Sequence, residues 1–302
     1  MNTLRNAQRA IFTVQIVNNK TVTITLDWLS FTFKRSSREE KAWFSQYTNS
    51  ETATPTTPRH GYSGASTEEN GILHMWNLER EEMGHHVVVS GSCLRDIIEY
   101  RGISQQTLLQ EVINAGASIT RLDLAKDAKD VYVDYDHIWS DLERGNYKGS
   151  AQKTARMQGG DGGDTIYIGS RTSDRFMRLY DKAAQTGNAD ILWSRLEIEY
   201  KGMVARAVSA LLAQDVHWSS VFNNEVSRML SLPEQSTFGV FVNSDDCAIG
   251  VPKIEKQVDR EKWIDQQVIK AVCQHYVEHP DSDAVKRLIE ALNFLRDMDS
   301  NK

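Results

Sequence analysis

The chain has 302 residues, of which 40% are hydrophobic and 25% charged, and its formal net charge is −6 at pH 7. This content suits one large domain or two modest ones with a substantial core. No apolar run approaches the length of a membrane span and the start lacks the apolar stretch of a signal peptide, so we expect a cytoplasmic protein without a membrane partner. The three cysteines are widely spaced and contain no Cys-x-x-Cys pair, which is typical of reduced thiols rather than a disulfide framework or a zinc site.

The acidic balance argues at first sight against a nucleic-acid partner, because a domain that holds many phosphates usually has a basic face. The charge is unevenly distributed, however. Between Arg144 and Lys182 there are eight basic and four acidic residues. Carboxylates that hold a metal ion also add to the negative count without repelling phosphates once the ion is bound. The net charge therefore does not exclude a nucleic-acid partner.

The first third of the chain begins with an expected hairpin and continues with an expected loop. Residues 12–33 alternate between apolar and polar and contain Asn18-Asn19-Lys20, which predicts two strands joined by a turn. Residues 34–67 are mostly polar and include Pro55 and Pro58. Prolines break helices and central strands, so this segment is predicted to be a loop or lid.

The middle of the chain alternates between strand and helix signals. Helical spacing predicts helices over 94–115, interrupted near Gly102, and over 135–142. Period-two alternation predicts strands at 72–77 and 85–90 and around Asp123, Thr165, Arg175 and Arg195. This order indicates an α+β domain with an antiparallel sheet and helices on one face.

The composition shifts after Gly202. Four segments have helical periodicity, at 203–212, 218–230, 259–277 and 284–298. We therefore divide the chain into residues 1–202, a domain that would carry the chemistry, and residues 203–302, a helical C-terminal region for packing or partner binding.

The segment from Arg178 to Lys182 holds a tyrosine between two cations. If it is extended, Arg178, Tyr180 and Lys182 share one face, while Met177 and Leu179 point into a core on the other. A phenol in this position can attack a phosphodiester, because the cations hold the phosphate and favour the phenolate, and the tyrosine becomes a covalent intermediate. The alternative is a strand tyrosine with solvated basic neighbours.

Two further strands have acidic faces. Period two gives each of them one charged face, made of Arg121, Asp123 and Asp127 in one strand and of Arg195, Glu197 and Glu199 in the other. Like charges on adjacent strands are destabilising, which suggests a cation between them. Hard oxygen ligands favour Mg²⁺ or Mn²⁺ over zinc. The alternative is that Arg121 and Arg195 neutralise the carboxylates in a cross-strand ladder.

Together these segments resemble a known family. The resemblance is carried, in order, by residues 27–32, 86–91, 119–127, 167–171, 178–182 and 195–199. This combination is similar to the replication initiation factor family, which comprises rolling-circle initiators of small plasmids (the Rep_trans type), related phage replication proteins and relaxases of conjugative elements. The resemblance covers roughly residues 20–203.

The resemblance implies an enzyme that nicks one DNA strand at an origin and transfers it, with a divalent metal. Tyr180 matches the family's nucleophile, which would leave a 5′-phosphotyrosine and a free 3′-hydroxyl that primes synthesis. The expected partner is origin DNA, single-stranded or supercoiled. A host helicase and a second copy of the chain are further expected partners.

The residues and the resemblance together assign roles to individual side chains. Arg178 and Lys182 are expected to hold the phosphate beside Tyr180. The guanidinium of Arg178 suits this role because it can donate two parallel hydrogen bonds to the phosphate oxygens. Expected metal ligands are Asp123 and Glu197, followed by Asp127 and Glu199. Expected DNA-binding residues are Arg171, Arg175 and Arg121.

The adjacent histidines 85 and 86 offer one further candidate ligand. Many rolling-circle enzymes with this chemistry hold the metal with two histidines that flank a single residue and so face the same side. Adjacent histidines on a strand face opposite sides, so at most one of this pair joins the site. His86 is the better candidate, and a solvated strand histidine is the alternative.

Three other functions share parts of this pattern. A conjugative relaxase would use the same chemistry as a replication initiator. A DNA-binding module that does not cut is expected if Tyr180 is buried or lies far from Asp123 and Glu197. A metal phosphoesterase that uses water as its nucleophile would leave a free 5′-phosphate and no protein adduct.

Overall fold

The computed structural model describes residues 24–34, 38–48, 52–147, 149–159, 163–188, 190–232, 236–242, 269–279, 282–284, 286–287 and 289–290. The expected opening hairpin lies outside these ranges up to residue 23, which includes its first strand and its turn. The chain divides into two compact units, Met1–Pro252 and Lys253–Lys302, and each is described by itself.

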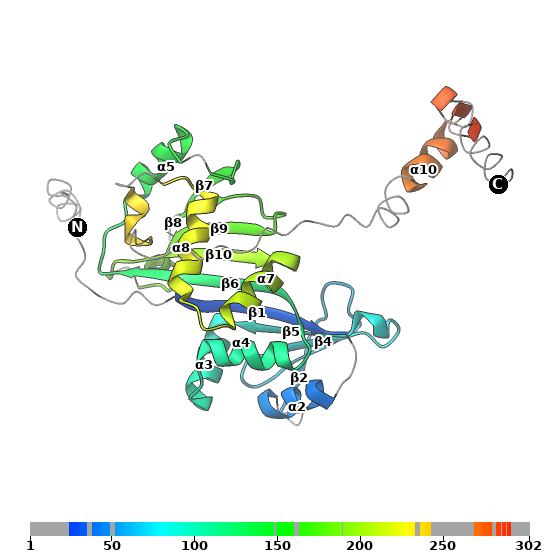
Figure 1. Cartoon of the computed structure of the whole chain (residues 1–302), viewed down its shortest axis with the longest axis horizontal. Coiled ribbons are helices and arrows are strands. Elements are labelled where there is room, and N and C mark those ends of the chain that lie inside the picture. The colour runs from blue at the N-terminus through cyan, green and yellow to red at the C-terminus, as the bar shows by residue number, and fades with distance from the viewer. Residues whose placement is uncertain are drawn as a thin grey trace. The chain divides into compact units, whose positions relative to one another are not determined.

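The first unit is built on one sheet, which has ten strands within the described residues (Figure 1). The strands are β1 (Ile24–Phe33), β2 (Thr54–Pro55), β3 (Gly64–Thr67), β4 (Leu73–Trp76), β5 (His85–Ser90), β6 (Ser118–Lys129), β7 (Thr154–Gln158), β8 (Asp164–Ile168), β9 (Arg175–Asp181) and β10 (Trp193–Lys201). Their order is β2-β3-β4-β5-β1-β6-β10-β9-β8-β7, and all neighbouring strands are antiparallel. The long strand β6 lies between β1 and β10 and is therefore hydrogen-bonded along both edges.

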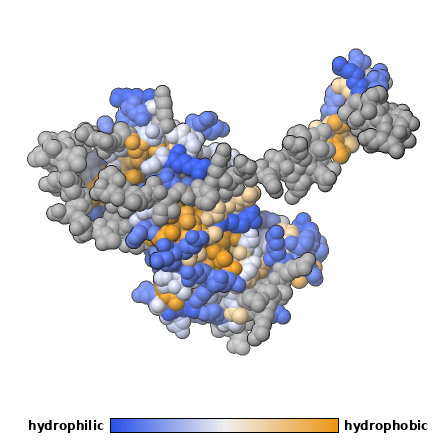
Figure 2. All heavy atoms as spheres, in the orientation of Figure 1, coloured by the Kyte–Doolittle hydropathy of each residue, from blue (hydrophilic) through white to orange (hydrophobic). Residues whose placement is uncertain are grey.

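Helices cover one face of this sheet, so the expected α+β class is confirmed. The helices are α2 (Arg38–Tyr47), α3 (Gly91–Arg101), α4 (Gln105–Asn114), α5 (Tyr135–Glu143), α6 (Lys182–Gln185), α7 (Gly202–Leu212) and α8 (Trp218–Met229). Figure 1 shows α4, α7 and α8 in front of the central strands. In the same orientation, hydrophobic residues gather around α7 with hydrophilic residues beside them (Figure 2).

The core lies between the sheet and this helix layer. Alternate residues of the central strands point into it, among them Leu122, Leu124 and Ile198, which are fully buried. Helix α7 contacts both β6 and β10, and its buried face is made of Val204, Ala205, Val208, Ser209 and Leu212. Each buried Leu or Ile side chain contributes roughly 1.5–3 kcal/mol through burial. Because strand residues alternate, this packing fixes which side chains lie on the opposite, polar face.

The segment expected to be a loop or lid is more ordered than that. It forms α2 and the short strands β2 and β3. The reason is its aromatic residues, since Trp43 and Tyr47 are four residues apart on one helical face and are both buried. Pro55 does sit in a strand, but that strand is β2 at the edge of the sheet, where a missing N–H donor is tolerated.

The boundary between compact units also differs from the expected one at residue 202. Helices α7 and α8 pack on the sheet, through contacts with β6, β10 and β1, and therefore belong to the first unit. In the second unit, the helix expected over 259–277 is described as α10 (Lys270–Glu278), and most of the helix expected over 284–298 lies outside the described residues. Across the residues that the structure describes, no helix is both long and apolar enough to cross a membrane.

Candidate active site on the polar face of the sheet

The register of β6, β10 and β9 brings the predicted charged residues together. Directly opposite residues share a face, and Arg195 lies between Asp127 of β6 and Tyr180 of β9. Glu197 in turn lies opposite Arg178, and Glu199 lies opposite Asp123. The polar faces predicted for the three strands thus form one continuous surface, because these strands are neighbours in the sheet and present their polar residues to the same side.

A bulge in β1 adds two side chains to this surface. The pairing of β1 with β6 shifts between Leu26 and Trp28, which leaves Asp27 as the extra residue. The Asp27 side chain reaches Arg195, and the ring of Trp28 lies against Arg121. Gly91 is required behind the bulge, since a Cβ there would come within 2.6 Å of the Asp27 carboxylate.

The surface contains a cavity of about 320 Å³. Its lining is predominantly polar and consists of Asp27, Trp28, Arg121, Asp123, Thr165, Tyr167, Arg178, Tyr180, Lys182, Gln185 and Glu197. The predicted nucleophile, both predicted phosphate-holding cations and the two first-choice metal ligands therefore line a single cavity.

Tyr180 is 8% exposed, and its hydroxyl donates a hydrogen bond to Oε2 of Glu197 over 3.2 Å. Burial, reinforced by the Glu197 carboxylate, raises the pKa of the phenol. The expectation that neighbouring cations favour the phenolate is therefore wrong for this arrangement, because burial and Glu197 outweigh Arg195 and Arg178. The burial of Tyr180 is the feature expected of a DNA-binding module that does not cut. Its contact with Glu197, in contrast, places the hydroxyl beside a proton acceptor at the cavity.

The two predicted phosphate-holding cations flank Tyr180 in different ways. Arg178 forms ion pairs with Glu197 and, over 3.6 Å, with Asp123. Lys182 begins α6 rather than continuing the strand, and its ammonium lies 5.7 Å from the centre of the Tyr180 ring and bonds Gln185. Burial and the nearby Arg195 lower the pKa of Lys182. Both cations thus line the cavity, and Arg178 is already paired with carboxylates.

Asp123 and Glu197 are the carboxylates that suit a hard cation. Both are buried, and they come from adjacent strands. Burial, opposed by Arg121 but reinforced by Glu197, raises the pKa of Asp123 to about 8. A divalent cation would offset that cost, and Mg²⁺ needs only one or two carboxylates because it keeps several waters. The donor set therefore fits Mg²⁺ or Mn²⁺, although no group of three His, Cys, Asp or Glu residues converges in the described part of the chain.

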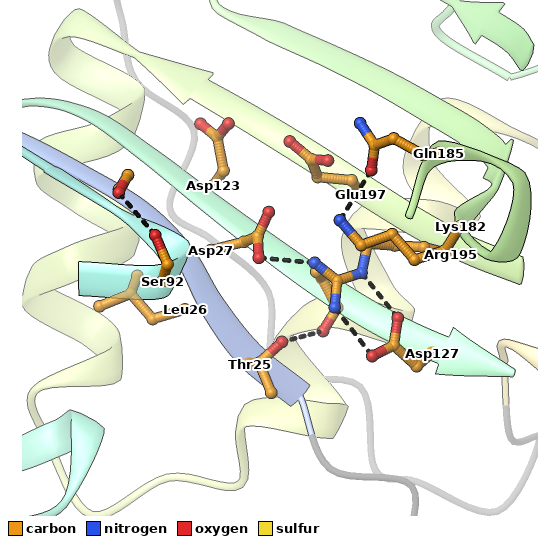
Figure 3. Close-up of polar contacts among 12 residues, drawn as sticks. Thr25, Leu26, Asp27, Ser92, Asp123, Asp127, Lys182, Gln185, Arg195 and Glu197 are labelled. Carbon is orange, nitrogen blue, oxygen red and sulfur yellow. Dashed lines mark hydrogen bonds and ion pairs between the residues drawn. The ribbon is translucent and has the colours of Figure 1, made fainter. Parts of the chain in front are cut away.

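Asp127 belongs to a different cluster. Arg195 donates to both of its carboxylate oxygens, over 2.6 and 2.8 Å, and to Asp27 over 2.6 Å. Figure 3 shows Arg195 between these two aspartates, with the carboxylates of Asp123 and Glu197 apart from them. The arginine–carboxylate ladder that was the alternative to a metal site is thus present in both clusters. Arg195 pairs with Asp127, which does not line the cavity, and Arg121 pairs with Asp123 and Glu199.

The three arginines predicted to bind DNA have three different environments. Arg121 pairs with Asp123 and Glu199 at the cavity. Arg171 is exposed and lies over the rings of Tyr167 and Phe176. Arg175 points the other way, into the helix-covered face, where it pairs with the fully buried Glu225 of α8 over 2.6 Å. Arg175 is therefore not available at the polar face, because its position in β9 is out of phase with Arg178.

The two histidines do face opposite sides of β5, as predicted. His86 bonds Thr32 over 2.8 Å and stacks on Tyr62. Thr32 lies four residues along β1 from Trp28, about 13 Å at the usual strand rise, so His86 is remote from Asp123. His86 does not line the cavity, and burial lowers its pKa to about 4.

Sequence reasoning missed Asp27, Trp28 and Tyr167 as members of this site. The bulge that aims Asp27 and Trp28 has no residue signature of its own. Tyr167 could have been found, because it pairs with Arg178 across the hairpin that was predicted between β8 and β9. A larger hollow of about 490 Å³ lies elsewhere, beside α2 and α3, and is bordered by Tyr47 and Arg101.

Comparisons with known proteins agree with this geometry. Residues 117–230, which include β6, β9 and β10, match the family model described as replication initiation factor, Rep_trans. A curated relative, the putative DNA relaxase NicK of Bacillus subtilis (strain 168), is 27% identical over 170 residues. That match covers 51% of this chain and 48% of the relative, so the chain spans about half of the relative's length.

The fold also matches a solved structure. A rolling circle replication initiator protein from Geobacillus stearothermophilus superposes with a TM-score of 0.60 at 21% identity, over 80% of this chain and 91% of that one. At this identity the match establishes the fold. The three matches together confirm the resemblance of this chain to the replication initiation factor family, with residues 117–230 as the part that the family model covers.

Proposed function

We propose that the chain nicks one strand of DNA at an origin, with Tyr180 as the nucleophile, and starts rolling-circle replication. The observation that carries this proposal is the hydrogen bond from Tyr180 to Glu197 inside a cavity that also holds Arg178, Lys182 and Asp123. A nucleophile, a proton acceptor and phosphate-binding cations in one cavity are the parts that phosphoryl transfer by a tyrosine requires.

In the proposed reaction, the Tyr180 oxygen attacks the scissile phosphorus while Glu197 takes the phenolic proton. The bond between phosphorus and the 3′ oxygen breaks, and that oxygen takes a proton from water. The products are a 5′-phosphotyrosine and a free 3′-hydroxyl. Because burial raises the pKa of the phenol, proton transfer to Glu197 must accompany the attack rather than precede it.

The charged residues of the cavity have complementary roles in this proposal. Arg178 releases its carboxylate partners and holds the phosphate oxygens, and Lys182 adds a second cation from α6. Asp123 and Glu197 would hold Mg²⁺ or Mn²⁺, which when bound would stabilise the charge that develops on the phosphate. Arg195 carries no direct step, but it fixes the strand position opposite Tyr180 through its pairs with Asp27 and Asp127.

A gel assay tests the proposal. Supercoiled DNA carrying the genomic region around the gene is incubated with the protein and Mg²⁺ or Mn²⁺, and nicked circles and protein–DNA adducts that survive denaturation are measured. We expect both with the wild type and neither with Tyr180→Phe. An adduct that persists in Tyr180→Phe would refute the nucleophile, and nicking that leaves a free 5′-phosphate would favour the phosphoesterase.

The metal is tested separately. We expect EDTA to stop nicking and added Mn²⁺ to restore it, with Asp123→Asn needing a higher metal concentration. Full activity in EDTA would remove the cation from the proposal while leaving Tyr180 in place. Binding without nicking under every condition would instead indicate a DNA-binding module.

A conjugative relaxase is the second candidate, because the curated relative is described as a putative DNA relaxase. The chemistry at Tyr180 would be the same. Two genetic assays separate these roles, since an initiator is required for replication of its replicon, whereas a relaxase is required for transfer of a mobile element between cells.

A further inference from the structure

Two aromatic rings, each capped by a guanidinium, lie on either side of the carboxylates in the cavity. The centre of the Trp28 ring of β1 lies 4.7 Å from the guanidinium carbon of Arg121, which belongs to β6. The centre of the Tyr167 ring of β8 lies 5.0 Å from the guanidinium carbon of Arg171, which lies between β8 and β9. Both residues line the cavity and are half-buried, so each keeps part of its surface exposed at the cavity.

Each ring is held in place by its own contacts. The Trp28 indole donates to the Ser30 hydroxyl over 2.7 Å. Tyr167 stacks on Phe176 with ring centres 5.7 Å apart and planes at 16°, and Phe176 is only 2% exposed. The rings therefore keep their orientation without a ligand, and a flat ligand that stacks on them would lose little entropy in ordering the protein.

The chemistry of a ring and a guanidinium side by side suits an unpaired nucleobase. Bases stack on aromatic rings and on the planes of arginine side chains, and the same cations attract the adjoining phosphates. Bases within a duplex are already stacked on each other, so only a single strand can use such a ring. Arg171, which was predicted to bind DNA, thus lies in an environment that suits base stacking.

The spacing of the two rings assigns them to different nucleotides. Strands β1 and β8 are four strand positions apart, about 19 Å at the usual separation of neighbouring strands. That is several times the rise of about 3.4 Å per base along one DNA strand. Tyr180 and Glu197 lie on the strands between them, so one ring is on each side of the proposed scissile phosphate.

We propose that Trp28 and Tyr167 are stacking sites for unpaired bases on the two sides of the phosphate at Tyr180. This assignment rests on the proposed function only for the position of the phosphate. Base binding itself needs neither the nucleophile nor a metal.

The test uses the full chain carrying Tyr180→Phe, without metal, so that no cleavage intervenes. Affinity is measured by fluorescence anisotropy for a short oligothymidylate and for an oligonucleotide of the same length whose sugars lack bases. Stacking tolerates any base, so the origin sequence is not needed. Tyr167→Phe keeps a ring and Tyr167→Leu keeps only apolar packing on Phe176. Tyr100→Ala removes a 93% exposed ring of α3 as a matched control.

We expect the parent protein to bind the oligothymidylate about tenfold more tightly than the abasic oligonucleotide. Tyr167→Phe and Tyr100→Ala should show the same preference. Tyr167→Leu and Trp28→Leu should each reduce this preference several-fold while binding the abasic oligonucleotide as the parent does. Equal thermal melting shows that each variant is folded. No preference in the parent, or an unchanged preference in both Leu variants, would overturn the inference. Neither outcome depends on whether the wild type nicks DNA.

Discussion

Two regions of the molecule contain a glutamate that contacts both a tyrosine and an arginine. They are Tyr47, Glu111 and Arg101 at α2, α4 and α3, and Tyr180, Glu197 and Arg178 in the central sheet. In both trios burial, reinforced by the glutamate, raises the pKa of the phenol. A tyrosine bonded to a carboxylate beside a guanidinium is therefore not by itself a mark of chemistry.

The difference between the trios lies in what surrounds them. Burial acts to raise the pKa of Glu111, but hydrogen bonds from Arg101 and Tyr47 hold it below its usual value. The sheet trio has a second carboxylate, Asp123, whose pKa is raised to about 8. Its cavity also holds Lys182. The helical trio is charge-balanced by itself, whereas the sheet trio shares its cavity with Asp123 and with the cations Arg121 and Lys182. The sheet cavity therefore offers both carboxylates that suit a metal and cations that suit a phosphate.

The largest expected effect separates the two tyrosines. Tyr180→Phe should abolish nicking and the covalent adduct, because the attacking oxygen is lost. Tyr47→Phe is the matched control and should nick at the wild-type rate, since its hydroxyl lies at a different hollow. Both are measured by adduct formation on supercoiled DNA. Loss of activity in Tyr47→Phe with an intact fold would mean that the helical trio takes part in the chemistry.

The second largest expected effect separates Glu197 from Glu111 in the rate of nicking. Glu197→Gln removes the proton acceptor of Tyr180 and should slow nicking by at least about 100-fold, the usual contribution of a general base. Glu111→Gln should leave the nicking rate unchanged. Single-turnover rates measure the effect, and the pH profile adds a second readout, because the variant should regain rate at higher pH as the phenol ionises. A variant that matches the wild type at every pH would exclude Glu197 as the base.

Asp123 should make the protein less stable as pH rises. With its pKa raised from 3.8 to about 8, the folded state holds a proton that the unfolded state has released, so stability falls as pH rises from about 4 to about 8. The slope within this window should approach about 1.36 kcal/mol per pH unit. Urea unfolding measures it, and Mg²⁺ should reduce it. Asp123→Asn should flatten this dependence and Glu111→Gln should not, whereas an unchanged slope in Asp123→Asn would contradict the assignment.

The smallest expected effect is that of the two tyrosine hydroxyls on the free energy of unfolding. Tyr47→Phe should lower the free energy of unfolding by about 1 kcal/mol, the usual net value of one hydrogen bond. Tyr180→Phe should change it less, because its hydroxyl bonds Glu197 over a longer 3.2 Å contact. Urea unfolding at pH 7 compares them, and a larger loss for Tyr180→Phe would reverse the comparison.

Much of the candidate site could be predicted from alternation alone. In the middle of β6, β9 and β10 apolar residues alternate with polar ones, and burial of the apolar residues against the helices leaves only one side for Asp123, Arg178, Tyr180 and Glu197. The same rule assigns Arg175 to the opposite face, in phase with Met177, so its prediction as a DNA-binding residue was avoidable. Its partner Glu225 comes from α8, and such a long-range pair has no local signal.

The rest of the site depends on tertiary structure that no short pattern encodes. The bulge at Asp27 becomes visible only through the register between β1 and β6, which an isolated strand does not specify. The separation of Asp127 from Asp123 likewise follows from Arg195, which faces Asp127 directly across the strands. In the polar stretch 34–67, the helical spacing of the aromatic residues was a usable signal that the prolines obscured.

Tyr180 lies on a strand that is hydrogen-bonded on both sides, to β10 and to β8. A residue on a mobile helix or loop could carry an attached DNA end away from the place of cleavage. One anchored between two strands cannot, so in the proposed reaction the 5′ end stays beside the carboxylates for the lifetime of the adduct. The joining step would then take place where the cut was made, and the incoming 3′ end, rather than the enzyme, would have to travel.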